Sequence, residues 1–341
     1  MIDYYGTIMG DDLTCFLPIF NDMWKKEIAS HNLPYEHSFQ ITTGNRLRPL
    51  LMAWGYYANC LDVDNKTIAD YALPIELIHK ASILLDDLID NDKARHELKT
   101  FHVQFSNSEA LLYALFMLNR GISLMYEKDI SQNNTHSHTL LKVIDSMARG
   151  GLKEVSSKNG IFNISEVKEI IDLETTSLIE NSFVLGYQLS SKRISDIPKE
   201  ILDIGHSCGY CFQILNDMEP FLAPDINQKY KGAINYDITK SRKNIVIALL
   251  YGACTQQERD RLLGSLNFDY IYRLIQNYEI IQLLIHEVES NIVNIRRSVG
   301  KLQHYNEYFY SDFQKFLTNM FNICFQKCNI SFKEEWFDDR C

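Results

Sequence analysis

Glycine and proline are scarce in this chain. Its 341 residues include 15 glycines and 7 prolines, which is 22 of 341 or about 6%, against an average of about 12% in proteins. With 46% hydrophobic residues the chain is long enough for a large core. So few chain breakers, together with apolar residues that recur every three or four positions, predict an all-α protein.

An excess of positive charge is also missing. The formal net charge is −10, which argues against a general nucleic-acid surface. The first residues, MIDYYGTIMGDDLT, show neither a basic n-region nor a long apolar h-region, so we expect no secretory signal. The longest uncharged apolar runs, such as 245–254, are too short to span a bilayer. These absences predict a cytoplasmic protein with no nucleic-acid partner and no transmembrane segment.

Cysteine is present, but without the spacing of a metal site. The eight cysteines are scattered, and the CxxC pair Cys208 and Cys211 has no second pair to accompany it. Cys324 and Cys328 are one helical turn apart. Free cysteine commonly behaves as a small buried hydrophobe, so we expect neither redox nor metal chemistry from these residues.

No strong domain boundary, internal repeat or low-complexity linker interrupts the chain, so residues 1–341 are expected to form a single helical domain. Helices are predicted at 12–30, 49–60, 65–92, 107–127, 138–157, 165–191, 198–221, 243–254, 256–265, 268–299 and 305–329. The longest break, 222–243, contains five cations, namely Lys229, Lys231, Lys240, Arg242 and Lys243. Such a segment suits a lid over a phosphate, and a solvated loop is the alternative.

The stretch 76–102, ELIHKASILLDDLIDNDKARHELKTFH, carries the strongest functional signal. Lys80 is the only charge between Glu76 and Asp86 in an otherwise apolar segment. Asp86 and Asp90 are four residues apart and therefore share one face of a helix. Two carboxylates one turn apart suit Mg²⁺, which completes its shell with water and substrate phosphates. A merely acidic helix end is the alternative, which the helix dipole disfavours at a C-terminus.

This stretch resembles the first aspartate-rich motif of the trans-isoprenyl diphosphate synthase family. GNRLRP at 44–49 resembles the family's GKRxRP, and SMARGGLKE at 146–154 resembles its GQxxD segment. LETTSLIENSFVLG at 173–186 resembles the KT helix, and GHSCGYCFQILND at 205–217 the approach to the second aspartate-rich motif. The resemblance implies a single large helical bundle of the isoprenoid synthase (class I terpenoid synthase) type with a central active-site cavity.

The resemblance also implies roles for individual residues. Three Mg²⁺ ions would be held by Asp86, Asp90 and Asp217 with Asn216, and Asp87 would orient its neighbours. The residues expected to contact diphosphate are Arg46, Arg48, His79, Arg95, Thr175, Gln213, Lys240 and Arg242. The catalytic set is then Asp86, Asp87, Asp90, Arg95 and Asp217, which together would stabilise a departing diphosphate.

Several positions depart from the family's pattern. The GKRxRP lysine is Asn45, the second arginine of an RR pair is His96, the KT lysine is Glu174, and Pro220 replaces the last aspartate of the second motif. A charge-assisted hydrogen bond contributes about 1.5–3 kcal/mol, so these losses predict a weak subsite for isopentenyl diphosphate (IPP). Arg46 is a candidate to replace the lost lysine, and Glu219 the lost aspartate. Ordinary drift around a working synthase is the alternative.

The cavity is expected to be roomy. Ala81 and Ser82 lie five and four residues before Asp86, where the family's short-chain members carry bulky aromatic residues. Small residues there leave space for a long or a folded chain. Phe183 and Phe212 are candidates to line the cavity and to stabilise a carbocation through their ring faces, with plain core packing as the alternative.

These observations predict Mg²⁺-dependent ionisation of a C15 or C20 allylic prenyl diphosphate. The weakened IPP subsite favours cyclisation of the cation or its capture by water, as in a terpene synthase. The alternatives are chain elongation with IPP, as in geranylgeranyl or longer-chain synthases, transfer to another acceptor, and a non-catalytic subunit. The intact DDLID motif, Arg95 and Asp217 argue against the last. By resemblance to the family we also expect a homodimer.

Overall fold

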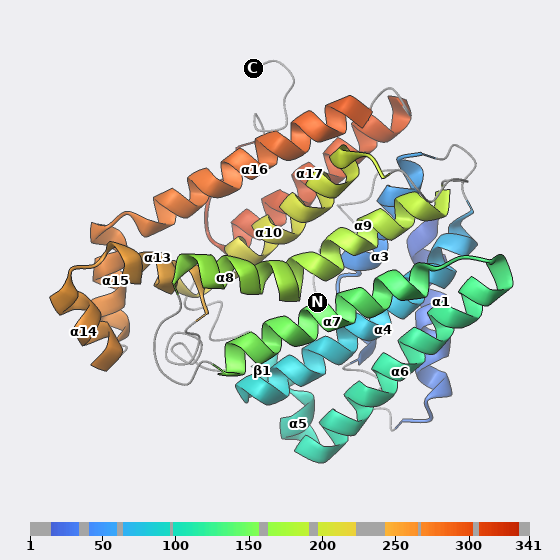
Figure 1. Ribbon diagram of the computed structural model, residues 1–341, viewed down its shortest axis with the longest axis horizontal. Coiled ribbons are helices and arrows are strands. Elements are labelled where there is room, and N and C mark those ends of the chain that lie inside the picture. The colour runs from blue at the N-terminus through green and yellow to red at the C-terminus, as the bar shows by residue number, and fades with distance from the viewer. Residues whose placement is uncertain are drawn as a thin grey trace.

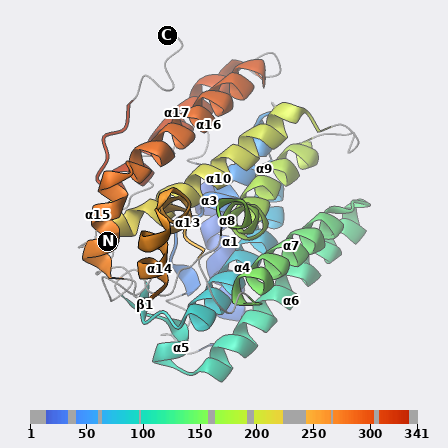
Figure 2. The same ribbon diagram turned by 60° about the vertical axis from the view of Figure 1, so that its left-hand side comes forward.

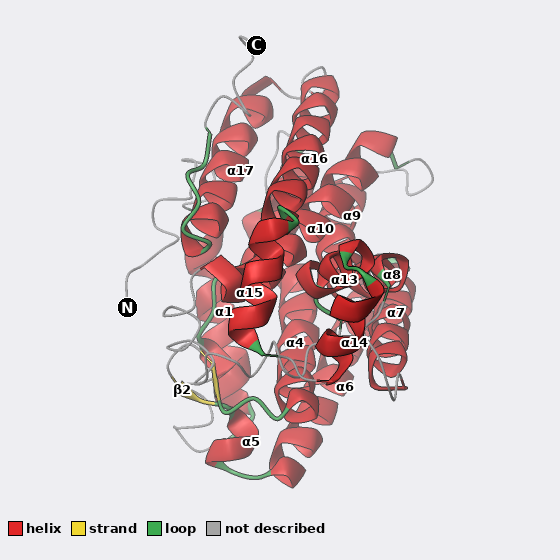
Figure 3. Cartoon of the chain, turned by 90° about the vertical axis from the view of Figure 1, so that its left-hand side faces the viewer, coloured by secondary structure: helices red, strands yellow, loops and turns green. Residues whose placement is uncertain are grey.

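The computed structural model of the protein describes residues 15–33, 41–59, 64–95, 98–156, 163–190, 197–222, 243–264, 267–302 and 307–333. Long helices lie side by side, with α16 and α17 on one side of the molecule and α6 and α7 on the other (Figures 1 and 2). Between these sides run α3, α4, α9 and α10. Apart from one short strand pair, the described residues contain helices and their connections (Figure 3).

The elements follow the predicted order closely. They are α1 (Phe16–Ser30), α3 (Leu47–Tyr57), α4 (Asn65–Asp90), β1 (Ala94–Arg95), β2 (Leu98–Lys99), α5 (Phe101–Gln104), α6 (Asn107–Gln132), α7 (His136–Ser156), α8 (Ile164–Ile171), η2 (Asp172–Thr176), α9 (Ser177–Ser190), α10 (Lys199–Leu222), α13 (Ile245–Ala253), α14 (Gln256–Gly264), α15 (Phe268–Asn277), α16 (Ile280–Leu302) and α17 (Glu307–Lys327). The prediction of an all-α protein is confirmed.

Helix α4 is the element that positions the acidic motif. The Asp64 side chain accepts hydrogen bonds from the backbone N–H groups of Lys66 and Thr67 and so caps its N-terminus. Its C-terminus falls at Asp90, where Asn91 adopts a left-handed conformation with φ 56°. The motif therefore occupies the last turn of a 26-residue helix whose interior is largely buried.

Helices α3 and α9 cross at very short range because each contributes a glycine. A Cβ atom on Gly55 would lie 2.0 Å from the carbonyl oxygen of Phe183, and one on Gly186 would lie 1.9 Å from that of Met52. Neither site tolerates a side chain without separation of the helices. This contact fixes α9, and with it the preceding turn η2, relative to the α3 and α4 pair.

The core beside this crossing is aromatic. Trp54 lies 5.2 Å from Phe313 and 5.6 Å from Phe316, measured between ring centroids, and Phe183 stacks on Phe313 at 5.4 Å. All four side chains are at most 1% exposed. Phe183, which was predicted to line a cavity, thus packs in the core, because its position on α9 brings its ring against Phe313 of α17.

Other predictions of secondary structure needed correction. The single helix predicted at 268–299 is two helices, α15 and α16, because Glu279 adopts a φ of 52° and breaks the run. The helix predicted at 165–191 contains the π-helical turn η2. The pairing of β1 with β2 and the short helix α5 were not predicted. His96, Lys240 and Arg242 lie outside the described residues.

Candidate active site

The carboxylates at the end of α4 lie in different surroundings. The Asp86 side chain is 51% exposed, whereas that of Asp87 is 5% exposed. Burial and the neighbouring charge of Asp86 raise the pKa of Asp90 to about 7. Two carboxylates that repel each other across one helical turn favour a proton or a divalent cation between them.

Arg95 reaches back to these carboxylates from β1. Its Nη2 lies 2.6 Å from Asp87 Oδ1 and 3.5 Å from Asp86 Oδ2, and its Nε donates to Asp87 Oδ1 at 2.8 Å. Burial alone would lower the pKa of Arg95, but the charges of Asp87 and Asp86 outweigh it and raise that pKa. Asp87 therefore anchors Arg95 beside the motif, a position that follows from the left-handed turn at Asn91 and the strand pairing after it.

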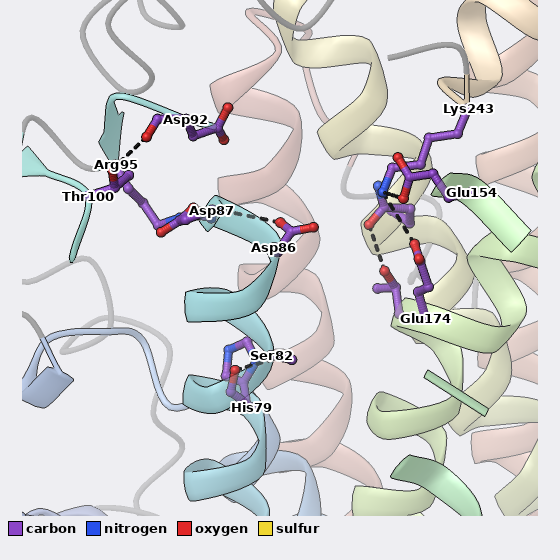
Figure 4. A network of polar contacts seen from close by, with 12 residues as sticks. His79, Ser82, Asp86, Asp87, Asp92, Arg95, Thr100, Glu154, Glu174 and Lys243 are labelled. Carbon is purple, nitrogen blue, oxygen red and sulfur yellow. Dashed lines mark hydrogen bonds and ion pairs between the residues drawn. The ribbon is translucent and has the colours of Figure 1, made fainter. Parts of the chain in front are cut away.

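A second charged group faces the acidic end of α4. It consists of Glu154 on α7, Glu174 on η2 and Lys243 just before α13, and Figure 4 shows Asp86 pointing toward it from α4. Lys243 Nζ lies 2.5 Å from Glu154 Oε2 and 3.3 Å from Glu174 Oε2. Burial alone would lower the pKa of Lys243, but Asp86 and the surrounding carboxylates raise it well above its usual value. Lys243 thus brings a positive charge next to Glu174, where the resemblance to the family had indicated that a lysine was lost.

A chain of hydrogen bonds joins three of the predicted residues. Thr175 Oγ1 donates to Gln213 Oε1 at 2.9 Å, and Gln213 Nε2 donates to Asp217 Oδ1 at 2.7 Å. The other Asp217 oxygen accepts from the backbone N–H of Ile245 at 2.9 Å, at the start of α13. A small pocket is lined by Ile170, Ile171, Glu174, Thr175, Gln213, Asp217 and Lys243. The KT segment and the second aspartate-rich motif are therefore in contact.

The remaining cations gather where α3 begins against α4. Arg48 Nη1 donates to His79 Nε2 at 2.8 Å, so these two predicted residues meet. Arg46 Nη1 instead pairs with Glu76 Oε1 at 2.8 Å, and its guanidinium lies 5.2 Å from the Trp24 ring centroid. Arg46 is thus held by a buried carboxylate rather than presented to a ligand.

Five other predicted residues lie on α4 and α10. Ala81 is fully buried, and the Ser82 hydroxyl donates to the His79 carbonyl oxygen at 2.8 Å. Phe212 is partly buried against the core, and Asn216 is half-buried on α10. Burial raises the pKa of Cys328, the residue that follows α17, and the charge of Glu219 raises that pKa further. Glu219 therefore lies on the side of α10 that is near the end of α17. The suggestion that Glu219 replaces the missing aspartate gains no support from this position.

Sequence reasoning missed Lys80 and Glu154. Lys80 stands among buried residues of α4, and its Nζ donates to the Thr43 carbonyl oxygen. The signal was present, because Lys80 is the one charge between Glu76 and Asp86. For Glu154 the signal was its place in the GQxxD-like segment, but its partner Lys243 is 89 residues away.

The carboxylates at and near Asp86 are the right kind of ligand for a hard divalent cation, but they are too few to surround one. Asp86, Asp90 and Asp217 offer only oxygen, which is what Mg²⁺ prefers. Within the described segments no three His, Cys, Asp or Glu side chains converge closely enough to hold a metal ion. The Asp86 and Asp90 pair therefore fits an ion that retains water and phosphate ligands, and Asp217 lines the small pocket that Glu174 and Lys243 also line.

Comparisons with known proteins identify the family of the chain. Residues 30–270 match the family model described as Polyprenyl synthetase. The chain is 25% identical over 239 residues to a geranylgeranyl diphosphate synthase of Saccharolobus solfataricus, covering 68% of this chain and 70% of that protein. It is 24% identical over 234 residues to a short chain isoprenyl diphosphate synthase of Methanocaldococcus jannaschii, covering 65% and 67%.

Among solved structures, the heptaprenyl diphosphate synthase of Staphylococcus aureus superposes with a TM-score of 0.74 at 18% identity, covering 90% of this chain and 98% of that one. The fold is therefore the all-α fold of the class I isoprenoid synthases. The chain belongs to the polyprenyl synthetase family, whose members are prenyltransferases of the trans-isoprenyl diphosphate synthase type. No helix in the described segments is both long and apolar enough to cross a membrane.

Proposed function

We propose that the chain is a chain-elongating (E)-prenyl diphosphate synthase that joins an allylic prenyl diphosphate to IPP with the help of Mg²⁺. The observation that carries this proposal is the presence of two separate regions suited to diphosphate along helix α4, each with an arginine from another element. Asp86 and Asp90 with Arg95 form one region, and His79 with Arg48 forms the other. Asp86 follows His79 by seven positions, about 10 Å along a helix.

Two regions for diphosphate fit a reaction with two diphosphate substrates. A cyclase ionises a single prenyl diphosphate and has no use for a second anion site. Both relatives named above are diphosphate synthases, which supports elongation. The comparisons give no support to the cyclisation or capture by water that the sequence analysis favoured.

In the proposed reaction the allylic C–O bond breaks, and the diphosphate leaves with the electron pair. The double bond of IPP then forms the new C–C bond, and a proton is lost. Bound Mg²⁺ would neutralise charge that develops on the leaving diphosphate. Arg95 and Lys243 lie on opposite sides of Asp86 and add fixed positive charge to that region.

The proposal includes a homodimer. Helix α6 forms one outer side of the molecule (Figure 1) and exposes large apolar side chains, namely Leu111, Leu112, Leu115, Phe116, Tyr126 and Ile130. Such a cluster on one helix favours association with another apolar surface. A second copy of this chain would bury it symmetrically.

Product analysis tests the proposal directly. Purified protein with Mg²⁺ and farnesyl or geranylgeranyl diphosphate is incubated with and without IPP, beside the variants Asp86→Asn and Asp145→Asn. Asp145 is an exposed residue of α7 paired with Arg149, so its variant controls for loss of a carboxylate. We expect a longer prenyl diphosphate only with IPP, and none from Asp86→Asn. Hydrocarbons or terpene alcohols formed without IPP would overturn the proposal in favour of a terpene synthase.

A further inference from the structure

The cluster between α3 and α4 holds more positive charge than its carboxylates can balance. Arg46, Arg48 and Lys80 are each at most 9% exposed, and Glu76 is the one carboxylate among the described residues that pairs with any of them. Its charge acts on both Arg48 and Lys80, but it is bonded to Arg46. Three cations against one anion leave a surplus of two positive charges in a buried place.

Hydrogen-bond donors are in surplus there as well. Arginine can only donate, so His79 Nε2 must accept from Arg48, and the His79 proton resides on Nδ1. That Nδ1 and Arg48 Nε are buried and have no hydrogen-bond partner among the residues that the structure describes. Among the described residues of this cluster, one oxygen of Glu76 is a buried acceptor without a partner. A ligand that completes this site must bring negative charge and several acceptor oxygens, which describes a diphosphate.

Lys80 is placed to serve such a ligand. It follows Glu76 by one turn on the same face of α4, and its amine lies under the loop that precedes α3. A Cβ atom on Gly44 would lie 2.8 Å from Lys80 Nζ, and Gly44 has a φ of 132°, so both space and backbone require glycine there. Gly44 itself is exposed. The amine therefore sits directly beneath a surface that solvent reaches.

We propose that Lys80 is a specificity-determining residue that binds the diphosphate of IPP together with Arg48 and His79, and supplies there the cation that is absent at Asn45. The proposal rests on the elongation reaction proposed above. It explains how a chain with Asn45 in its GNRLRP motif can still bind IPP.

A bracing role for Lys80 is the competing explanation, since its amine also bonds the Thr43 carbonyl oxygen. One carbonyl accepts a single proton of the three on an ammonium group. Burial in the absence of a bonded carboxylate lowers the pKa of Lys80 to about 8. A brace for one loop does not require a buried charge, whereas an anion site does.

Steady-state kinetics with both substrates separate the two explanations. We expect Lys80→Met to raise the KM for IPP about 10- to 100-fold, the range for loss of one charge-assisted hydrogen bond. The KM for the allylic substrate should change less than about twofold. Lys80→Arg should stay near the wild type, and Asn45→Lys should restore IPP binding in the Lys80→Met background. Lys128→Met, which removes a lysine of α6 that is paired with Asp70 of α4, is the control.

Calorimetry with inorganic pyrophosphate in EDTA provides a readout that does not depend on turnover. Binding should be lost in Lys80→Met and kept in Asp86→Asn. An unchanged KM for IPP, or equal rises in both KM values with a lower melting temperature, would overturn the role of Lys80. If the wild type gave no IPP-dependent product, the elongation reaction would fail, whereas loss of pyrophosphate binding in Lys80→Met would still support an anion site at Lys80.

Discussion

Substitution of Arg46 tests the structural interpretation, because the sequence and the structure assign different roles to this residue. The sequence predicted a diphosphate contact, whereas the structure pairs Arg46 with Glu76 at 2.8 Å, with side chains only 6% and 2% exposed. Arg46→Met keeps an unbranched side chain and keeps the same left-handed backbone, with φ 57°, so backbone strain is unchanged. Breaking a buried pair from one side costs about 3–5 kcal/mol. We expect that loss in the free energy of unfolding.

Urea unfolding followed by circular dichroism measures this loss, with unchanged m-values as evidence of comparable folded states. Arg46→Met combined with Glu76→Met should be less stable than Arg46→Met alone, because the charge of Glu76 also acts on Arg48 and Lys80, and the double variant leaves these two buried cations without it. If Arg46→Met kept full stability but raised the KM for a diphosphate substrate, the structural reasoning would be refuted and Arg46 would be a ligand.

Three further changes probe the acidic groups and the apolar helix. Asp90→Asn should stabilise the metal-free protein near neutral pH, by at most about 4 kcal/mol for a pKa raised from 3.8 to about 7. The folded wild type holds this proton more tightly than the unfolded chain, so its stability should fall as pH rises from about 4 to about 7, and less so in Asp90→Asn. The single variants Glu174→Lys and Lys243→Glu should each lower the free energy of unfolding. The double variant, in which the two charges are exchanged, should regain part of that loss, with a coupling energy of about 1–3 kcal/mol in urea unfolding. Leu112→Glu on the exposed face of α6 should convert dimers to monomers in analytical ultracentrifugation.

Matched controls make these outcomes decisive. Asp145→Asn, which removes an exposed carboxylate of α7, is the control for Asp90→Asn. Additive effects of the Glu174 and Lys243 substitutions would show that the two charges do not interact. Leu283→Glu on α16 should keep the oligomeric state, since Leu283 is as exposed as the α6 leucines but on another side. A wild type that sediments as a monomer would refute the dimer.

Local sequence signals predicted most of the helices, because those signals act over a few residues. Asp64 and Asn163 cap helices that begin at the next residue, and each had a neighbouring apolar run to mark it. The division between α15 and α16 escaped prediction, since Glu279 adopts φ 52° without being glycine or asparagine. The π-helical turn at 172–176 likewise has no local signal, because it depends on how α8 and α9 pack on α7 and α10.

The sequence by itself determined the all-α fold, the acidic end of α4 and the presence of the motifs expected in this family. Those features follow from residue spacing along single helices. Only the tertiary structure decided that Arg46 belongs to Glu76, that Lys243 stands beside Glu174, and that Lys80 lies beneath Gly44. The partners of these charges come from distant parts of the chain. The burial of each ion pair then determines how strongly its charges interact. Neither the distance between two charges nor their burial can be read from the order of residues.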